Sequence, residues 1–167
     1  LGFKMKVMRN KEKHTVKSFM TEKAKKNAKQ KIKTHIKRIK KNTTAVEVSK
    51  LNATILGLQN FYQQATMVSK DFSEIAFSVK RTLYNSLKHV SSENGELSKY
   101  YQMHYKDYLG KKKIFVAKVA IFPIDGVKHK NPKNFTQEIN NYTIEGRSLI
   151  HKTQKSVSEG IVRYLVR

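Results

Sequence analysis

Cysteine and tryptophan are absent from this chain of 167 residues, and only two prolines interrupt it. Without cysteine, disulfide bonds and thiolate metal sites are excluded, and a reducing intracellular setting is compatible with the composition. Acidic residues are scarce, because 12 Asp and Glu stand against 35 Lys and Arg, a formal net charge of +23. No Asp-Asp pair is present that could hold two magnesium ions for phosphoryl transfer, and no glycine-rich phosphate loop occurs. The sequence therefore contains no complete active site.

Positive charge is concentrated at one end of the chain. Residues 1–41 hold 16 Lys and Arg against two Glu, whereas residues 42–79 hold two Lys against three acidic residues. A clustered surplus of this size repels itself unless a polyanion lies against it. Nucleic acid is therefore the first partner to consider.

The longest stretch without a charged residue, Leu51 to Ser69, is long enough to raise the question of a membrane span. Its Asn, Gln, Thr and Ser side chains would lack hydrogen-bond partners in hydrocarbon. We therefore expect a core helix and no contact with a membrane. The location expected for the protein is the bacterial cytoplasm. No signal peptide is visible, and a first residue other than Met suggests a fragment of a longer protein.

A hairpin followed by helices is expected in the first half of the chain. Residues 3–7 alternate apolar and basic, and residues 14–19 can return as the second strand. Thr21 is a suitable N-cap for a first helix whose lysines lie opposite an apolar seam. The seam consists of Ala24, Ala28, Ile32, Ile36 and Ile39. A second helix after residues 42–44 carries the repeat Val48, Leu51, Ile55, Leu58 and Tyr62, and can pack against this seam.

A third helix is expected to begin at Asp71, with Glu74 three residues later completing a capping arrangement. An aromatic helix over residues 97–109 should end at Gly110, and a strand should cover residues 114–122.

Two further helices are expected over residues 135–142 and 143–151. The predicted fold is therefore mainly α, with an N-terminal β-hairpin, a three-helix bundle and a small α+β C-terminal segment.

The lysine-rich face of the first helix is the strongest functional signal. Such a face is usually just solvated, but this one has almost no acidic partners four residues away that would offset repulsion between like charges, Glu22 before Lys26 being the exception. We therefore expect phosphate contacts there. The tyrosines of residues 100–108 can stack on bases, although tyrosines at helical spacing are more often core residues.

Histidines and carboxylates give little support to a metal site or to catalysis. The six histidines lack the spacing of metal ligands, and His35 is expected at the border of the apolar seam. Asp125 and His129, with Asn131 and Asn134, could suggest a nuclease, but no second acidic ligand lies close by. A capped turn is the simpler interpretation. We assign no catalytic residue and no metal ligand, and we expect no cofactor.

The stretch LNATILGLQNFYQQATMVSKDFSEIAFSV, residues 51–79, resembles the thumb or maturase region, called domain X, of bacterial group II intron reverse transcriptases. Leu56-Gly57-Leu58 and Asn60-Phe61-Tyr62 match the family pattern of Gly between apolar residues, followed by Asn and two aromatics. Asp71 to Ala76 match a downstream Asp-Phe-(Ser/Ala)-x-Ile-Ala pattern. LGFKMKV resembles the last block of the palm, SFMTEKA resembles the entry to the thumb, and residues 121–152 are similar to the segment that follows the thumb.

The resemblance implies a fragment whose parent copies RNA into DNA with magnesium and helps its intron RNA to fold for splicing. Residues 1–20 would end the palm, residues 21–110 would form the thumb, and residues 111–167 would lead to a DNA-binding region. The Tyr-Ala-Asp-Asp motif of the palm and the Cys and His pairs of an HNH nuclease are absent, so the fragment should be inactive alone. Implied partners are group II intron RNA and an RNA template with a DNA primer, with target DNA as a further candidate.

Positions of this chain that match the family pattern imply two groups of residues, one structural and one that binds nucleic acid. The thumb scaffold would consist of Gly57, Asn60, Phe61, Tyr62, Asp71, Phe72 and Ile75. Nucleic acid would be bound by Lys23, Lys26, Lys33, Lys37, Arg38, Lys40, Lys41, Lys80, Arg81, Lys111, Lys112 and Lys113. Proteins hold an A-form duplex through its backbone and 2′-hydroxyls, which suits Lys and Arg on helices.

A stand-alone basic RNA-binding protein of ribosomal type is the alternative hypothesis. The gene sequence upstream of Leu1 separates the two, because a palm with paired aspartates favours the fragment and an immediate start codon excludes it.

Overall fold

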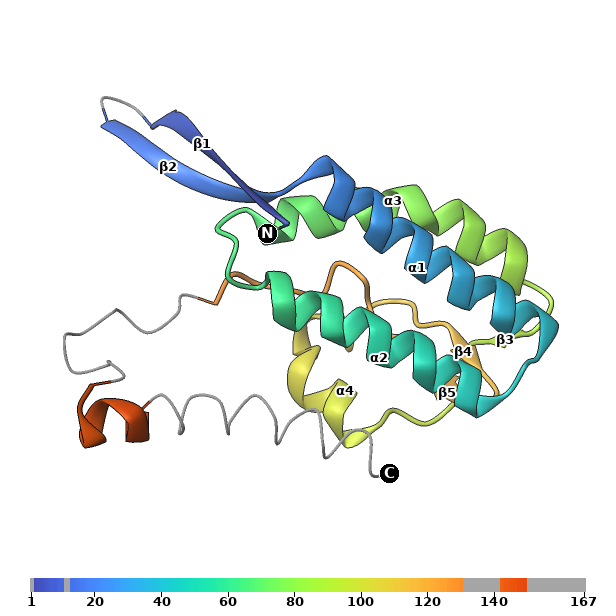
Figure 1. The fold of residues 1–167 in the computed structure, drawn as a ribbon. Coiled ribbons are helices and arrows are strands. Elements are labelled where there is room, and N and C mark those ends of the chain that lie inside the picture. Colours follow the sequence, from blue (N-terminus) through green and yellow to red (C-terminus); the bar gives the residue numbers. More distant parts are fainter. Residues whose placement is uncertain (1, 11–12, 131–141, 150–167) are drawn as a thin grey trace. The chain divides into compact units, whose positions relative to one another are not determined.

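The computed structural model describes residues 2–10, 13–130 and 142–149, and these are mainly helical (Figure 1), which confirms the fold class expected from the sequence. Contacts divide the chain into two units, Leu1–Lys130 and Asn131–Arg167. In the second unit, residues 144–149 are helical and the Thr143 hydroxyl accepts a hydrogen bond from Gly146 N at 3.0 Å. The helix expected over residues 135–142 and the nuclease candidates Asn131 and Asn134 lie outside the described residues.

The N-terminal hairpin is present and longer than expected. Strand β1 (Phe3–Asn10) pairs antiparallel with β2 (Lys13–Met20), in a register that places Val7 opposite Val16. Because side chains alternate across a strand, these two valines share one face of the hairpin with Met5. All three are exposed. The hairpin extends away from the ends of the neighbouring helices (Figure 1).

Helix α1 (Glu22–Lys41) forms where the sequence predicts it. The Thr21 hydroxyl accepts a hydrogen bond from Ala24 N at 3.2 Å, so Thr21 is the N-cap, and Glu22 lies in the first turn, where the helix dipole favours an acid. All five residues of the predicted seam are buried: Ala24, Ala28, Ile32, Ile36 and Ile39. The opposite faces carry the lysines. One narrow apolar stripe therefore fixes the direction in which every cation of α1 points.

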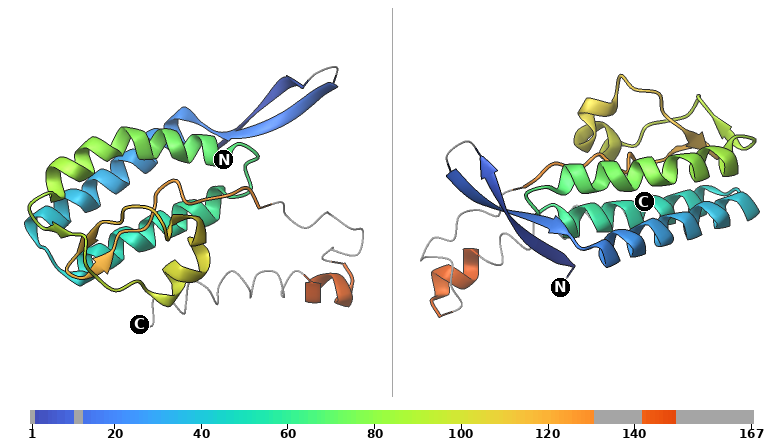
Figure 2. Two further views of the ribbon diagram at one scale, coloured as in Figure 1. Left: turned by 180° about the vertical axis from the view of Figure 1, so that it is seen from behind. Right: turned by 90° about the horizontal axis from the view of Figure 1, so that it is seen from above.

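Helices α2 (Ala45–Tyr62) and α3 (Val68–Leu87) both pack against α1, and Figure 2 shows the three side by side. The predicted start of the third helix at Asp71 is wrong. Helix α3 begins one turn earlier, after Met67, which makes no capping hydrogen bond through its side chain. Asp71 and Glu74 instead face α1, where they meet lysines, so their spacing reflects tertiary contacts.

The helices and strands after α3 are shorter than the sequence predicts. Strand β3 (Ser91–Ser92) is followed by α4 (Lys99–His104) and the 3₁₀ turn η1 (Lys106–Tyr108), so the predicted helix over residues 97–109 is wrong in length. The predicted strand over residues 114–122 is also wrong, because it is divided into β4 (Phe115–Val116) and β5 (Val119–Ala120). Together with β3, these two strands form a three-stranded sheet in the order β3-β4-β5.

A two-residue turn separates β4 from β5. Its central residues, Ala117 and Lys118, have φ values of 48° and 63°, which is the positive φ that tight hairpin turns require. Neither residue is Gly or Asn, the usual sequence signals for such a turn. The apolar run around them therefore reads as one strand in the sequence.

Two amides on α2 hold the returning chain against this helix. Asn52, which is fully buried, donates to Ala120 O and accepts from Phe122 N, each at 2.8 Å. Gln59 Nε2 donates to Pro123 O at 2.8 Å. Because α2 packs on α1 with one face and on this segment with the other, residues up to Lys130 belong to the same unit as the three helices. The sequence-based expectation instead places the end of the thumb at residue 110, which lies within this unit.

Candidate nucleic-acid interface

Helix α1 carries two sets of cations, one on each side of its buried seam. On the side of α3, Lys26, Lys33 and Lys37 line a shallow groove. At 1.5 Å per residue, the distance along the axis from the first to the last is about 16 Å, which equals the rise of several phosphates along one strand of a duplex. Lys26 and Lys37 are exposed, and Lys33 is half-buried.

On the side of α2, Lys23, Lys31 and Arg38 line two adjoining grooves between the helices. Gly57 of α2 is also at the surface of this region, and a Cβ atom added to it would meet nothing within 4 Å. The backbone of α2 is therefore open to an approaching ligand at this point.

We define the α1 cation surface as the outward-facing cations of both sets together with the two at the end of the helix. Its members are Lys23, Lys26, Lys31, Lys33, Lys37, Arg38, Lys40 and Lys41. Within the described part of the chain, none of them forms an ion pair with a carboxylate. The sequence-based prediction does not include Lys31, although this residue lies about two turns after Lys23 and thus on the same side of the helix.

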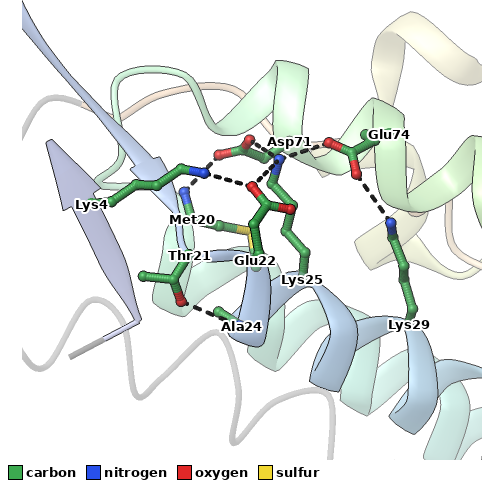
Figure 3. Close-up of polar contacts among 9 residues, drawn as sticks. All are labelled: Lys4, Met20, Thr21, Glu22, Ala24, Lys25, Lys29, Asp71 and Glu74. Atoms are coloured by element: carbon green, nitrogen blue, oxygen red, sulfur yellow. Dashed lines mark hydrogen bonds and ion pairs between the residues drawn. The ribbon is translucent and has the colours of Figure 1, made fainter. Parts of the chain in front are cut away.

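Two other lysines of α1 have a structural role instead. Lys25 is buried and its Nζ lies 2.9 Å from Asp71 Oδ1 and 2.7 Å from Glu74 Oε2 (Figure 3). The second Asp71 oxygen accepts a hydrogen bond from Met20 N at 2.7 Å, and Lys29 pairs with Glu74 at 3.0 Å. This cluster joins the end of β2, the first turns of α1 and the start of α3.

The same contacts change the pKa of Lys25 and of Glu74. Burial lowers the pKa of Lys25, but hydrogen bonds to Glu74 and Asp71 outweigh burial, so the pKa lies above its usual value. The hydrogen bond from Lys25, followed by the one from Lys29, lowers the pKa of Glu74. Lys25 and Glu74 are thus held in their charged forms. Because Lys25 and Lys29 are paired with carboxylates, neither lysine is free for nucleic acid.

The remaining predicted cations form a second surface, on α3 and the loop after η1. Lys80 lines a groove with Lys111, Lys112 and Lys113, while Arg81 is exposed beside it on α3. None of the α1 cations lines this groove. The structure therefore separates into two surfaces the residues that the sequence treats as one group.

The three consecutive lysines of this second surface differ in what they contact. Lys111 Nζ lies 4.1 Å from the centroid of the Tyr108 ring, a cation–π contact. Lys112 forms an ion pair with Glu93, and Lys113 Nζ donates to Leu109 O. Lys113 thereby stabilises the turn after η1. Because Lys112 and Lys113 are already bonded within the protein, Lys111 is the most available of the three to a ligand.

The predicted scaffold residues occupy different environments. Phe72 and Ile75 are fully buried between helices, and Tyr62 is 9% exposed. Phe61, which is exposed, stacks on Phe3 at a centroid distance of 5.8 Å, and Tyr62 contacts the same ring at 5.3 Å. These aromatics connect the hairpin to the end of α2. Asn60 is half-buried, and Asp71 belongs to the lysine cluster.

Several residues that the sequence left open are now placed. Tyr101 and Tyr105 are each 3% exposed, as expected for core tyrosines. His35 is half-buried at the edge of the seam, where burial and then Arg38 lower its pKa. Its Nε2 lies 3.0 Å from the Thr54 hydroxyl. Asn52 and Gln59, which the sequence showed only as polar residues in an apolar run, form the link to the returning chain.

The described residues contain no group of three or more His, Asp or Glu that could hold a metal ion. Burial, followed by the nearby Asp125 carboxylate, raises the pKa of Tyr108 to about 12, and His129 Nδ1 lies 3.2 Å from Gln63 O. No helix in the described ranges is long and apolar enough to cross a membrane.

Comparison with protein-family models, with curated proteins and with solved structures finds no match to this chain. The resemblance to group II intron reverse transcriptases therefore rests on the sequence motifs alone.

Proposed function

We propose that this chain is the nucleic-acid-binding thumb and maturase portion of a group II intron reverse transcriptase. In this role it holds intron RNA and the duplex of RNA template and DNA primer. The observation that carries the proposal is the α1 cation surface, in which eight cations on one helix have no carboxylate partner in the described residues. A polyanion would supply the missing negative charge.

The packing of α1 supports this function. Its buried seam fixes the helix on α2 and α3, so the backbone positions of the outward lysines are held in rows and only the side chains have to be ordered by the ligand. A rigid row of cations suits the phosphates of an A-form duplex, whose deep and narrow major groove hides the base edges. We therefore expect binding that depends on duplex shape and charge and little on sequence.

The order of elements is also the one that the resemblance implies for a palm end followed by a thumb. A hairpin leads directly into α1, and α2 and α3 follow. The residues of the motif, from Gly57 to Tyr62, lie at the end of α2 that meets the hairpin.

The experiment reverses three charges of the α1 cation surface. The variant Lys26→Glu, Lys33→Glu, Lys37→Glu should lose affinity for an RNA duplex and an RNA–DNA hybrid by tenfold or more. The slope of log affinity against log salt should become shallower by about 2 to 3, because each lost phosphate contact removes slightly less than one unit. Fluorescence anisotropy across a salt series measures both quantities, and circular dichroism checks that the helices are retained.

The matched control reverses three exposed lysines outside α1 in the variant Lys99→Glu, Lys106→Glu, Lys118→Glu. It has the same net charge as the α1 variant, so its affinity should fall much less if binding is local. Equal losses in the two variants would show that net charge alone drives binding, and unchanged affinity in the α1 variant would exclude α1 as the contact surface.

A further inference from the structure

A groove with an apolar floor and a basic edge lies between α3 and the chain that follows η1. Its volume is about 380 Å³. Ile121 and Phe122 belong to its floor, and Lys80 and Lys111 to its edge. We call it the α3 groove.

Two aromatic rings are exposed on α3, one that lines the α3 groove and one that does not. Phe77, which lines the groove, is 83% exposed, and Tyr84 is 65% exposed. They are seven residues apart, so they lie on the same side of α3 with about 10 Å between them along the axis. A single exposed ring is common on protein surfaces, but exposed apolar groups that lie together beside a groove mark a contact with a ligand or partner.

Cations lie between and beside these rings. Lys80 and Arg81 fall between Phe77 and Tyr84 in the sequence and are exposed, and no carboxylate of the described chain pairs with them. The Lys111 ammonium lies above Tyr108 on the other side of the groove. An apolar peptide would leave these charges unsatisfied, whereas a polyanion would neutralise them.

We propose that the α3 groove binds unpaired nucleotides of single-stranded RNA. Bases stack on Phe77 and Tyr84, and the backbone phosphates contact Lys80, Arg81 and Lys111. Aromatic rings that alternate with cations are the arrangement by which proteins hold single strands, since every base has a face that can stack. Bases inside a duplex are stacked on their neighbours and have no free face, so this site takes a different form of nucleic acid from the α1 cation surface. The inference deepens the proposed function, because it assumes that RNA is the ligand.

The test removes the rings and leaves every charge in place. In the variant Phe77→Ala, Tyr84→Ala, affinity for a single-stranded RNA that contains 2-aminopurine should fall about fivefold or more for each ring lost. Quenching of the 2-aminopurine fluorescence, which reports stacking, should disappear. Affinity for an RNA duplex of the same length should change by less than about twofold, because α1 is intact.

Three single variants sharpen the result. Phe77→Tyr retains a ring and should bind as the wild type does, whereas Phe77→Leu retains apolar volume without a ring and should bind as Phe77→Ala does. Met103→Ala removes an apolar side chain that is 68% exposed and lies outside the groove, and it should have no effect.

Two outcomes overturn the inference and are distinct from failure of the proposed function. Normal single-strand affinity and quenching in the double variant would exclude stacking at the groove. Full binding by Phe77→Leu would indicate an apolar contact, as for a protein partner. Failure of the wild-type chain to bind duplex RNA would instead count against the proposed function.

Discussion

Lys25 shows how far neighbouring lysines of one helix can differ. It is 7% exposed and contacts Asp71 and Glu74 of α3, whereas Lys26 beside it points to solvent. A buried charge is tolerated only when it is paired and hydrogen-bonded, so removing one partner leaves the other without compensation. The carboxylate at risk here is Asp71, which is 1% exposed.

The variant Lys25→Ala should therefore lower the free energy of unfolding by about 3 kcal/mol, because Asp71 would keep only its hydrogen bond from Met20 N among the described contacts. Lys26→Ala, the matched control, should change it by less than about 0.5 kcal/mol. Urea unfolding followed by circular dichroism measures both. Equal midpoints for the two variants would show that the Lys25 cluster does not stabilise the fold.

Gly57 is a second residue whose surroundings give a clear expectation. It lies inside α2 with open space around the position of a Cβ atom, so Gly57→Ala should raise the free energy of unfolding by about 0.5–1 kcal/mol through helix propensity. At Gly126 a Cβ atom would lie 2.7 Å from the Tyr105 ring, and Gly126→Ala should destabilise the fold by about 1–3 kcal/mol. Thermal unfolding of the pair is the measurement, and a destabilised Gly57→Ala variant would contradict the open groove.

At the scale of elements, α1 could be derived from the sequence because its signals are local. The N-cap at Thr21 and the seam from Ala24 to Ile39 are visible within about six turns of one helix. The start of α3 could not, because Asp71 and Glu74 imitate a capping box while their real partners lie far away in the sequence. A carboxylate near a helix start has the same spacing whether it meets a backbone N–H or a distant lysine.

The candidate site was predictable to a similar degree. The cations of α1 follow from helical periodicity, which places Lys26, Lys33 and Lys37 on one side. Periodicity cannot show that Lys112 meets Glu93 or that Lys113 supports a turn, since both contacts depend on how the loop after η1 folds.

Helix α2 links α1 to the returning chain, which it binds through side-chain amides. In Asn52→Ala, Phe122 N and Ala120 O would both lose their buried partner, so the free energy of unfolding should fall by about 2 kcal/mol or more. Hydrogen exchange at Phe122 N should become much faster, while the amides in the middle of α1 should change less. Asn85→Ala, an exposed asparagine on α3, serves as the control. Retained protection at Phe122 would show that apolar packing alone holds this segment.

At the scale of the whole molecule, the surplus of positive charge is used in two ways. A few lysines are paired in the interior or along the helix contacts, as in the Lys25 cluster, and these bring elements together. Most of the outward lysines of α1 have no carboxylate partner in the described chain, so they repel one another. Folding brings these charges closer than they are in an extended chain, and the fold is therefore less stable than its apolar core alone would make it.

Added salt should for this reason stabilise the protein. Repulsion between exposed charges is screened over about 10 Å at 0.1 M salt, while the buried Lys25 cluster is screened much less. Between about 50 and 300 mM KCl we expect Tm to rise by about 2–4 °C, which corresponds to about 1 kcal/mol for a chain of this size. The variant Lys26→Glu, Lys33→Glu, Lys37→Glu should show a smaller rise, because part of the repulsion is already removed. Calorimetry of both proteins across the salt series is the measurement, and a Tm that is constant or falls with salt in the wild-type chain would mean that self-repulsion on α1 is too weak to require a polyanion.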